Sequence, residues 1–404
     1  MITLADIKQA RDRVAPVIRK TPLERSDSLS RLASRDVWLK PEHLQRTGSY
    51  KIRGAYNFIS RLDPGVEVVA ASAGNHAQGV ALAAALTGHK ATIFMPSNAA
   101  LPKVEATRAY GAAVRLEGAV FDDANTIAQA YAEEHGAVFV PPFDHPLIIA
   151  GQGTTGLEIS DEAPDDLETV VVPVGGGGLI SGVSTALAHT KRNVKVIGVE
   201  AEGAPAMQAS VRAGKCVTLD SIATMADGIA VKNVCDLTLA HVQAYVDEVV
   251  TVSEEEISRA LLLLVERAKA VVEPAGAVAL AAVLAGRIGA HTGAGAGPVA
   301  VILSGGNVDP LLLMKVIDHG MSAAGRYLVL RIVMGDQPGA LAALTAAIAE
   351  LGLNVLEVEH HRSGVRLGVN EVEVLVTLET RDPEHREETV GALQQHGFRV
   401  ELVR

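Results

Sequence analysis

Residues 66–96, VEVVAASAGNHAQGVALAAALTGHKATIFMP, decide the fold of this chain. They begin with the apolar run VEVVAAS, pass through an alanine-rich stretch typical of a helix, and end with a second apolar run, ATIFMP. Continuous apolar strands joined by a helix indicate parallel strands buried on both faces, because parallel neighbours need a long crossover connection. The stretch therefore predicts an α/β protein built on a parallel sheet.

The same alternation extends along the chain in both directions. A short strand is predicted at 37–40, and strands and helices alternate from 66 to 142. After a long helix near 148–163, apolar strands are predicted at 169–174, 194–200, 245–253 and 298–306. We expect two α/β lobes that share one cleft, with a small lobe of roughly residues 52–150 inserted in a larger one. The Gly/Ala-rich segment 291–298 predicts a surface loop.

The pattern changes near residue 322, where SAAGR is typical of a linker. From 327 to 403 the order is strand, helix, strand, strand, helix, strand, and apolar residues alternate along the strands instead of forming continuous runs. A βαββαβ unit of this kind is a ferredoxin-like fold. The chain is therefore predicted to divide into residues 1–321 and residues 322–404.

Composition excludes several classes of protein. Of the 404 residues 48% are hydrophobic, which is ample for a sizeable core, and the net charge is −11. Nucleic acids and anionic membranes attract basic faces, so the charge argues against both as partners. Two cysteines, Cys216 and Cys235, are too few for a disulfide framework, and no apolar run resembles a signal peptide or a membrane span. These features predict a soluble, cytoplasmic protein.

The strongest local signal is a loop of four glycines, Gly175, Gly176, Gly177 and Gly178, between an apolar strand and a helix. Backbone amides at a helix N-terminus bind anions, and glycine lets the backbone close on a phosphate. The loop is not a P-loop, since no Lys-Ser/Thr follows, and it does not fit GxGxxG. The phosphate is therefore expected to belong to something other than ATP or NAD. The alternative is a tight strand-to-helix turn.

Three further candidates lie where predicted loops meet helices or strands. Lys51 follows the loop-like RTGSY and begins a helical pattern, although a lone lysine is most often a solvated cation. Ser72 to Gly79 (SAGNHAQG) follows one strand and Ser304 to Asn307 (SGGN) follows another, at the strand ends where open α/β sheets bind ligands. His76 has an equally plausible packing or capping role, and Ser304 alone would more often be a helix cap.

A reactive lysine, an anion loop, a loop of amides and a hydroxyl at a strand end together suggest an aldehyde cofactor with a phosphate group. No ligand spacing suggests a transition-metal site, and no GxSxG suggests a serine hydrolase. The motifs SYKIRGA, SAGNHAQG, GGGG and LSGGN, in this order, resemble those of fold-type II pyridoxal 5'-phosphate enzymes, above all threonine ammonia-lyases and their relative serine racemase. The resemblance covers about residues 5–320. It implies a two-lobed fold like that of the tryptophan synthase β subunit.

This resemblance implies a role for each motif. Lys51 would hold pyridoxal phosphate as a Schiff base and later remove the Cα proton, while Gly175 to Gly178 would bind the phosphate. Asn75 would contact the ring hydroxyl oxygen and Ser304 the pyridine nitrogen. The substrate carboxylate would bind the segment Ser72, Ala73, Gly74 and His76.

The implied reaction is the conversion of L-threonine to 2-oxobutanoate and ammonia, with L-serine to pyruvate as a second activity, in isoleucine biosynthesis or threonine degradation. Serine racemase carries an acid/base serine where this chain has Ala73, which favours elimination. The racemase-like cation site would use Glu200, the Ala204 carbonyl and an acid at a position that here is Ala206, so Glu200 is only a weak metal candidate. The alternatives are a serine dehydratase or racemase-like enzyme, and a catalytically dead amino-acid sensor.

Residues 322–404, with DQPGAL and GLNV, resemble an ACT regulatory domain. The resemblance suggests an isoleucine or valine effector, and an effector site that includes Asp336, Gly339, Leu341 and Asn354. Because such domains commonly pair, it also implies a homodimer or homotetramer. The alternative is a structural dimerisation module that binds no ligand, since allostery requires the effector to prefer one state of the catalytic lobes.

Overall fold

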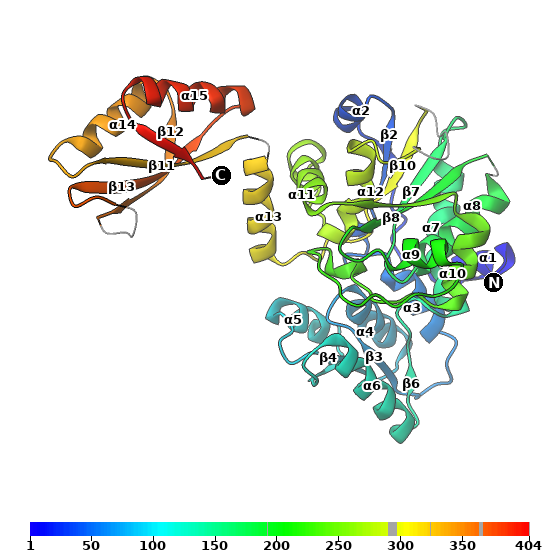
Figure 1. The fold of residues 1–404 in the computed structure, drawn as a ribbon. Coiled ribbons are helices and arrows are strands. Elements are labelled where there is room, and N and C mark those ends of the chain that lie inside the picture. The colour runs from blue at the N-terminus through cyan, green and yellow to red at the C-terminus, as the bar shows by residue number, and fades with distance from the viewer. Residues whose placement is uncertain (192, 290–296, 324, 363–366, 404) are drawn as a thin grey trace. The chain divides into compact units, whose positions relative to one another are not determined.

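The computed structural model describes residues 1–191, 193–289, 297–323, 325–362 and 367–403 (Figure 1). Contacts divide the chain into two compact units, Met1–Leu313 and Met314–Arg404. Helix α13, Pro310–Ala323, contains both this division and the predicted boundary after residue 321. Most of the surface loop predicted at 291–298 lies outside the described residues.

The larger lobe of the first unit is built on a six-stranded sheet with the order β1-β2-β10-β7-β8-β9. All neighbouring strands are parallel except the two-residue edge strand β1, which is antiparallel to β2. The strands are β1 Glu24–Arg25, β2 Val37–Lys40, β7 Thr169–Pro173, β8 Lys195–Ala201, β9 Glu248–Val252 and β10 Val299–Ile302. Their neighbouring helices are α1 Leu4–Val14, α2 Asp27–Ala33, α7 Pro146–Glu162, α8 Gly178–Thr190, α9 Ala206–Ala213, α10 Asp236–Tyr245, α11 Glu254–Leu263 and α12 Pro274–Leu284.

The smaller lobe is a four-stranded parallel sheet with the order β5-β4-β3-β6. Its elements are α3 Lys51–Ile59, β3 Val68–Ala71, α4 Asn75–Thr87, β4 Ala91–Met95, α5 Leu101–Ala109, β5 Ala113–Leu116, α6 Phe121–His135 and β6 Val138–Phe139. Residues 66–96 thus form β3, α4 and β4, with Val68 paired to Ala91. This confirms the parallel, helix-connected arrangement predicted from their apolar pattern.

Apolar strands explain why the sheets fold as they do and where the site must lie. Every residue of β3, β4, β7 and β10 is buried, as expected for strands covered by helices on both faces. Ser72, Gly175 and Ser304 come shortly after the carboxyl ends of β3, β7 and β10. Polar loops that follow parallel strands gather at one edge of a sheet, and that edge is where α/β proteins bind ligands.

The second unit is an antiparallel sheet with the order β12-β13-β11-β14 and two helices. Its elements are β11 Tyr327–Gly335, α14 Ala340–Glu350, β12 Asn354–His361, β13 Glu371–Glu379, α15 Pro383–Gln395 and β14 Arg399–Leu402. Buried and half-buried residues alternate along β11 and β13, because one face of the sheet packs on the helices. The predicted βαββαβ order is confirmed.

Several elements were not predicted from the sequence. They include α2, α9, α10, the 3₁₀ turns Glu42–Leu44 and Asp227–Ile229, and a π-helical turn Leu264–Ala268. This turn ends at Lys269, which adopts φ 57°. Across the described ranges, the length and polarity of every helix rule out a bilayer-spanning segment.

Candidate functional site

Lys51 is the first residue of α3, and backbone hydrogen bonds join the loop before it to the loop after β10. The N–H of Tyr50 donates to the carbonyl oxygen of Ser304 at 3.2 Å, and the N–H of Gly306 donates to that of Gly48 at 2.8 Å. The Lys51 amine donates to the carbonyl oxygen of Pro142 at 2.9 Å. The lysine is therefore held between the loop after β10 and the segment after β6.

The surroundings of Lys51 disfavour its charged form. Burial lowers the pKa of the amine from 10.5 to about 8, and the carboxyl of Glu273 opposes this shift only in part. The side chain remains partly accessible, so it is reachable from the site. A lysine whose pKa lies this low has a useful neutral fraction near physiological pH, which a nucleophile or general base requires.

The tetraglycine loop presents amides that have no other use in the fold. Within the described ranges, the N–H groups of Gly175 to Gly178 donate to no protein acceptor. Gly177 has φ 88° and caps α8, so the helix dipole adds positive potential at the loop. A Cβ on Gly176 would lie 2.3 Å from Cδ1 of Phe143, and one on Gly178 would lie 3.1 Å from its Cα. Phe143 comes so close to the loop that a Cβ would clash, and the free amides can bind a phosphate. Both features account for these glycines better than a turn alone does.

The loop after β3 offers a second set of amides. The N–H groups of Ala73, Asn75 and His76 donate to no other described part of the chain, whereas that of Gly74 donates to Oγ of Ser72 at 3.1 Å. The His76 ring is buried and its Nε2 lies 2.9 Å from the carbonyl oxygen of Val140. Burial, with the Lys51 charge, lowers the pKa of His76 to about 3, so the ring is neutral. The loop can hold a carboxylate through amides, while the His76 ring is buried against Val140.

Ser304 follows β10 of the six-stranded sheet and has a hydroxyl that makes no hydrogen bond within the described part of the chain. The residue is 4% exposed, and its Oγ has no hydrogen-bond partner in the described part of the chain. Ser49, which forms an antiparallel bridge with Gly305, also has a buried hydroxyl without a partner. A buried hydroxyl is normally hydrogen-bonded, so the unpaired one of Ser49, two residues before Lys51, indicates a place for a polar ligand.

Two residues of the site, Glu273 and Asn307, were not predicted from the sequence, and both contact Asn75. The Asn75 amide Nδ2 donates to Oε1 of Glu273 at 2.5 Å, and its Oδ1 accepts from Nδ2 of Asn307 at 2.7 Å. Burial, reinforced by Asp227, raises the pKa of Glu273 to about 7. Asn307 belongs to the quoted LSGGN motif but received no role, and Glu273 stands in the segment VVEPAGA without a local signal.

Glu200, the weak metal candidate, is used as a helix cap. Its carboxylate accepts the N–H groups of Met207 and Gln208, at 2.7 and 2.8 Å, where α9 begins. Burial nevertheless raises its pKa to about 8, since two hydrogen bonds do not replace lost hydration. No group of three or more His, Cys, Asp or Glu residues within the described ranges has the arrangement of a metal site.

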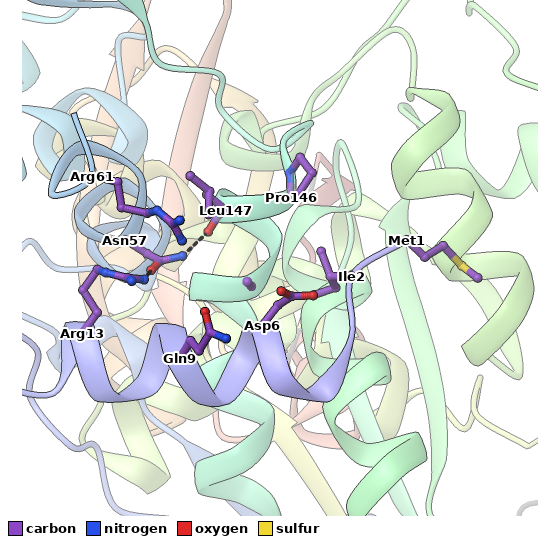
Figure 2. A pocket seen from close by; sticks show the side chains of 10 residues that line it. Met1, Ile2, Asp6, Gln9, Arg13, Asn57, Arg61, Pro146 and Leu147 are labelled. Carbon is purple, nitrogen blue, oxygen red and sulfur yellow. Dashed lines mark hydrogen bonds between the residues drawn. The ribbon is translucent and has the colours of Figure 1, made fainter. Parts of the chain in front are cut away.

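A separate cavity of about 110 Å³ lies at the other end of α3 from Lys51 (Figure 2). Figure 2 shows Asp6 and Gln9 of α1 pointing into the same space as Arg61. It is lined by Met1, Ile2, Asp6, Gln9, Arg13, Asn57, Arg61, Pro146, Leu147 and Ala150. It contains none of the predicted site residues, so it is not the cofactor site.

In the second unit, the predicted effector residues lie at the start of α14 and of β12. Gly339 caps α14 with φ 91°, and the N–H groups of Gly339 and Leu341 donate to no other described residue. Asp336 lies 3.5 Å from the guanidinium of Arg362. Asn354 begins β12 and lies 3.4 Å from a carboxylate oxygen of Glu379.

The comparisons with known proteins agree with this geometry. The profile of the pyridoxal-phosphate dependent enzyme family matches residues 14–305, and that of the ACT domain matches residues 328–398. L-threonine ammonia-lyase of Thermotoga maritima is 48% identical over 406 residues, which cover 100% of both chains. This chain belongs to the threonine ammonia-lyase family. It is a pyridoxal-phosphate dependent enzyme with a C-terminal ACT domain, as its motifs predicted.

Two solved structures of related enzymes share the fold of most of this chain. Threonine deaminase isoform 2 from Solanum lycopersicum is 39% identical, with a TM-score of 0.74 over 78% of this chain and 92% of that chain. Maize serine racemase has the same TM-score with 36% identity, over 80% of this chain and 98% of that chain. Fold alone therefore does not separate a lyase from a racemase, and the separation has to come from individual residues.

The residues present fit pyridoxal phosphate. An aldehyde needs an amine, which Lys51 offers, and a phosphate needs donors, which the free amides of the tetraglycine loop offer. The unpaired hydroxyl of Ser304 and the amide of Asn75 suit the polar atoms of an aromatic ring. Lys51 adjoins the Ser304 loop through Tyr50, and its amine donates to the carbonyl oxygen of Pro142, whose neighbour Phe143 packs on the tetraglycine loop. Burial penalises the charge of the amine, and a neutral amine is the form that adds to a carbonyl.

Proposed function

We propose that this protein converts L-threonine to 2-oxobutanoate and ammonia in its first unit, with residues 1–321 as the catalytic domain and 322–404 as the regulatory one. The observation that carries the proposal is the position of Lys51: its amine is largely buried, and backbone hydrogen bonds join the loop before it to the Ser304 loop. The end-to-end similarity to L-threonine ammonia-lyase supports the choice of substrate. Pyridoxal phosphate, when bound, supplies the electron sink for loss of the Cα proton.

Each residue then has a defined task. The amides of Ala73, Asn75 and His76 hold the substrate carboxylate, and Gly175 to Gly178 hold the cofactor phosphate. Ser304 offers a neutral hydroxyl to the pyridine nitrogen, which favours prompt loss of the β-hydroxyl over a long-lived carbanion. Lys51, neutral once its amine is free, accepts the Cα proton. The β-hydroxyl takes up a proton and leaves as water, and hydrolysis of the resulting enamine yields the keto acid and ammonia.

Ala73 supports elimination over racemisation. A racemase needs proton-transfer groups on both faces of Cα, and the methyl group of Ala73 cannot exchange a proton. Lys51 is then the base on one face only. We propose that L-serine is a second substrate, converted to pyruvate, because it carries the same β-hydroxyl.

The test is a keto-acid assay on the pyridoxal-phosphate-loaded enzyme with threonine and with serine. We expect turnover of L-threonine and slower turnover of L-serine to their keto acids. We expect no formation of D-serine from L-serine. Lys51→Ala should abolish turnover, while Lys90→Ala, an exposed lysine away from the site, should leave it unchanged. A cofactor-loaded wild-type enzyme without activity on either amino acid would refute the proposal, and D-serine formation would favour the racemase-like alternative.

For the second unit we propose regulation by isoleucine or valine. Free amides at the start of α14 suit the carboxylate of an amino acid, and ACT domains are small-molecule modules by resemblance. Adding isoleucine or valine to the assay should shift the threonine concentration at half-maximal rate. Asp336→Ala should weaken that response and leave the rate without effector unchanged. Inhibition by isoleucine would favour a biosynthetic role, and no response to either amino acid would leave a purely structural domain.

A further inference from the structure

Asn75 is held between two side chains that come from distant parts of the chain. Glu273 precedes α12 and Asn307 follows β10, so they lie 198 and 232 residues from Asn75 in sequence. Both contacts are short, at 2.5 and 2.7 Å. Glu273 is 4% exposed, and Asn75 and Asn307 are partly buried, so water competes weakly for these bonds.

The direction of each hydrogen bond follows from one backbone atom. The carbonyl oxygen of Thr47 can only accept, and it lies 2.7 Å from the Asn307 amide, so this atom of Asn307 is the nitrogen. The second N–H of that nitrogen points to Asn75, whose facing atom must therefore be the oxygen. The remaining Asn75 atom is the nitrogen, and it donates to the Glu273 carboxyl. A flipped Asn75 would set two donors against each other at Asn307 and, when the Glu273 carboxyl is ionised, two acceptors at Glu273.

We propose that Glu273 and Asn307 are positioning residues that lock the Asn75 amide so that it offers the cofactor ring oxygen a donor and never an acceptor. The inference rests on the proposed contact of Asn75 with that oxygen. One N–H of Asn75 is used by Glu273 and its oxygen is used by Asn307, which leaves one N–H for a ligand. A donor at this place stabilises the deprotonated ring oxygen.

The same bonds couple the lock to Lys51. Thr47 lies four residues before Lys51, and the loop between them is joined to the Ser304 loop through Tyr50. A Cβ on Gly48 would lie 2.3 Å from Oδ1 of Asn307, so the loop is packed directly on the Asn307 side chain. One nitrogen of Asn307, Nδ2, thus holds both the loop before Lys51 and the Asn75 amide that faces the ring.

The test uses the pyridoxal-phosphate-loaded enzyme and reads its absorption spectrum. The ratio of the near-ultraviolet to the visible band of the bound cofactor reports the protonation of its ring oxygen, and spectroscopic titration gives the cofactor Kd. Asn307→Asp can only accept, so it should raise the band ratio at least threefold and raise Kd by about tenfold, the effect of one lost hydrogen bond. Asn307→Ala and Glu273→Ala should shift both in the same direction. Glu273→Gln keeps an acceptor for Asn75 and should stay within about twofold of wild type.

Asp227→Asn is the control for charge, because Asp227 acts on Glu273 only through its field and makes no hydrogen bond to Asn75 within the described ranges. It should leave the band ratio unchanged. A wild-type ratio and Kd in both Asn307 variants would overturn the proposal, as would a shift in Glu273→Gln equal to that in Glu273→Ala. If Glu273→Ala does not fold, the two Asn307 variants decide. Because the readout needs only bound cofactor, a protein that binds it on Lys51 but does not turn over threonine refutes the proposed function and still tests the lock.

Discussion

Arg53 and Glu42 are both shielded from solvent and are joined by two hydrogen bonds, from Nε at 2.8 Å and from Nη2 at 2.7 Å. Arg53 also contacts both carboxylate oxygens of Glu158, at 2.7 and 2.9 Å. Burial alone would raise the pKa of Glu42, but the Arg53 charge and its hydrogen bonds hold it below its ordinary value. Because Arg53 lies two residues after Lys51, this buried network anchors the first turn of α3 on the 3₁₀ turn Glu42–Leu44 and on α7.

Removing the Arg53 charge should therefore destabilise the catalytic unit strongly. Arg53→Met leaves Glu42 buried and unpaired, and breaking a buried pair in this way costs about 3–5 kcal/mol. Urea unfolding of the apoenzyme measures the loss. Arg267→Met, in an exposed pair with Glu266, should cost about 0–1 kcal/mol. Equal losses in the two variants would show that the buried network contributes no special stability.

The reactivity of Lys51 in the cofactor-free protein should follow a pKa near 8. Burial disfavours the ammonium form, so labelling by an amine-reactive reagent should rise through about pH 8, as followed by peptide mass spectrometry. Glu273→Gln should move this transition to lower pH, because the Glu273 carboxyl raises the pKa of Lys51. Lys20 is the internal control, since its hydrogen bond to Glu162 raises the pKa of that exposed amine. Parallel labelling of the two lysines would contradict the shift.

Alanine substitutions in the tetraglycine loop should separate crowding by the Phe143 ring from crowding by the Phe143 backbone and Cβ. Gly176→Ala places a methyl group against the Phe143 ring, 2.3 Å from Cδ1, and should weaken cofactor binding at least about tenfold. Phe143→Ala in the same protein should restore most of the affinity. Gly178→Ala meets the Cβ, Cα and carbonyl oxygen of Phe143 at 2.9, 3.1 and 3.1 Å, so the same second change should not rescue it. Cofactor titration of the four variants decides, and rescue of both would mean that the backbone yields.

Stability should depend on pH through Glu200. Burial raises its folded pKa to about 8, above the ordinary 4.5, so the folded state binds the proton more tightly. The stability that this proton contributes is complete below about pH 4.5 and is lost as pH rises through about 8, with a slope of at most roughly 1.4 kcal/mol per pH unit. Between about pH 7 and 8, thermal unfolding should show a steeper loss of stability in wild type and in the exposed control Glu202→Gln than in Glu200→Gln. Below pH 7 the raised pKa of Glu273 adds a slope to all three proteins, so the comparison is made above it. An unchanged slope in Glu200→Gln would contradict the assignment.

Local features of the chain were predictable because their causes lie within a few residues. The buried strands and helices of 66–96 follow from apolar runs and periodicity, and the βαββαβ unit follows from alternation. The tetraglycine loop and the loop after β3 are readable because a strand, a turn and a helix N-terminus are consecutive in sequence. Helix α10 lacks such a pattern, and its packing on α8 and α9 stabilises it more than its own periodicity does.

The sequence by itself thus determined the family and the cofactor, and it predicted the role of Lys51, since each depends on short motifs in a set order. Only the tertiary structure decided what surrounds Lys51 and Asn75. Glu273, Asn307 and the Arg53–Glu42 pair act across gaps of 198, 232 and 11 residues, and nothing near each residue in sequence indicates its partner. The physical reason is that hydrogen-bond direction and pKa depend on distance and burial in space, which the folded chain sets and the order of residues does not display.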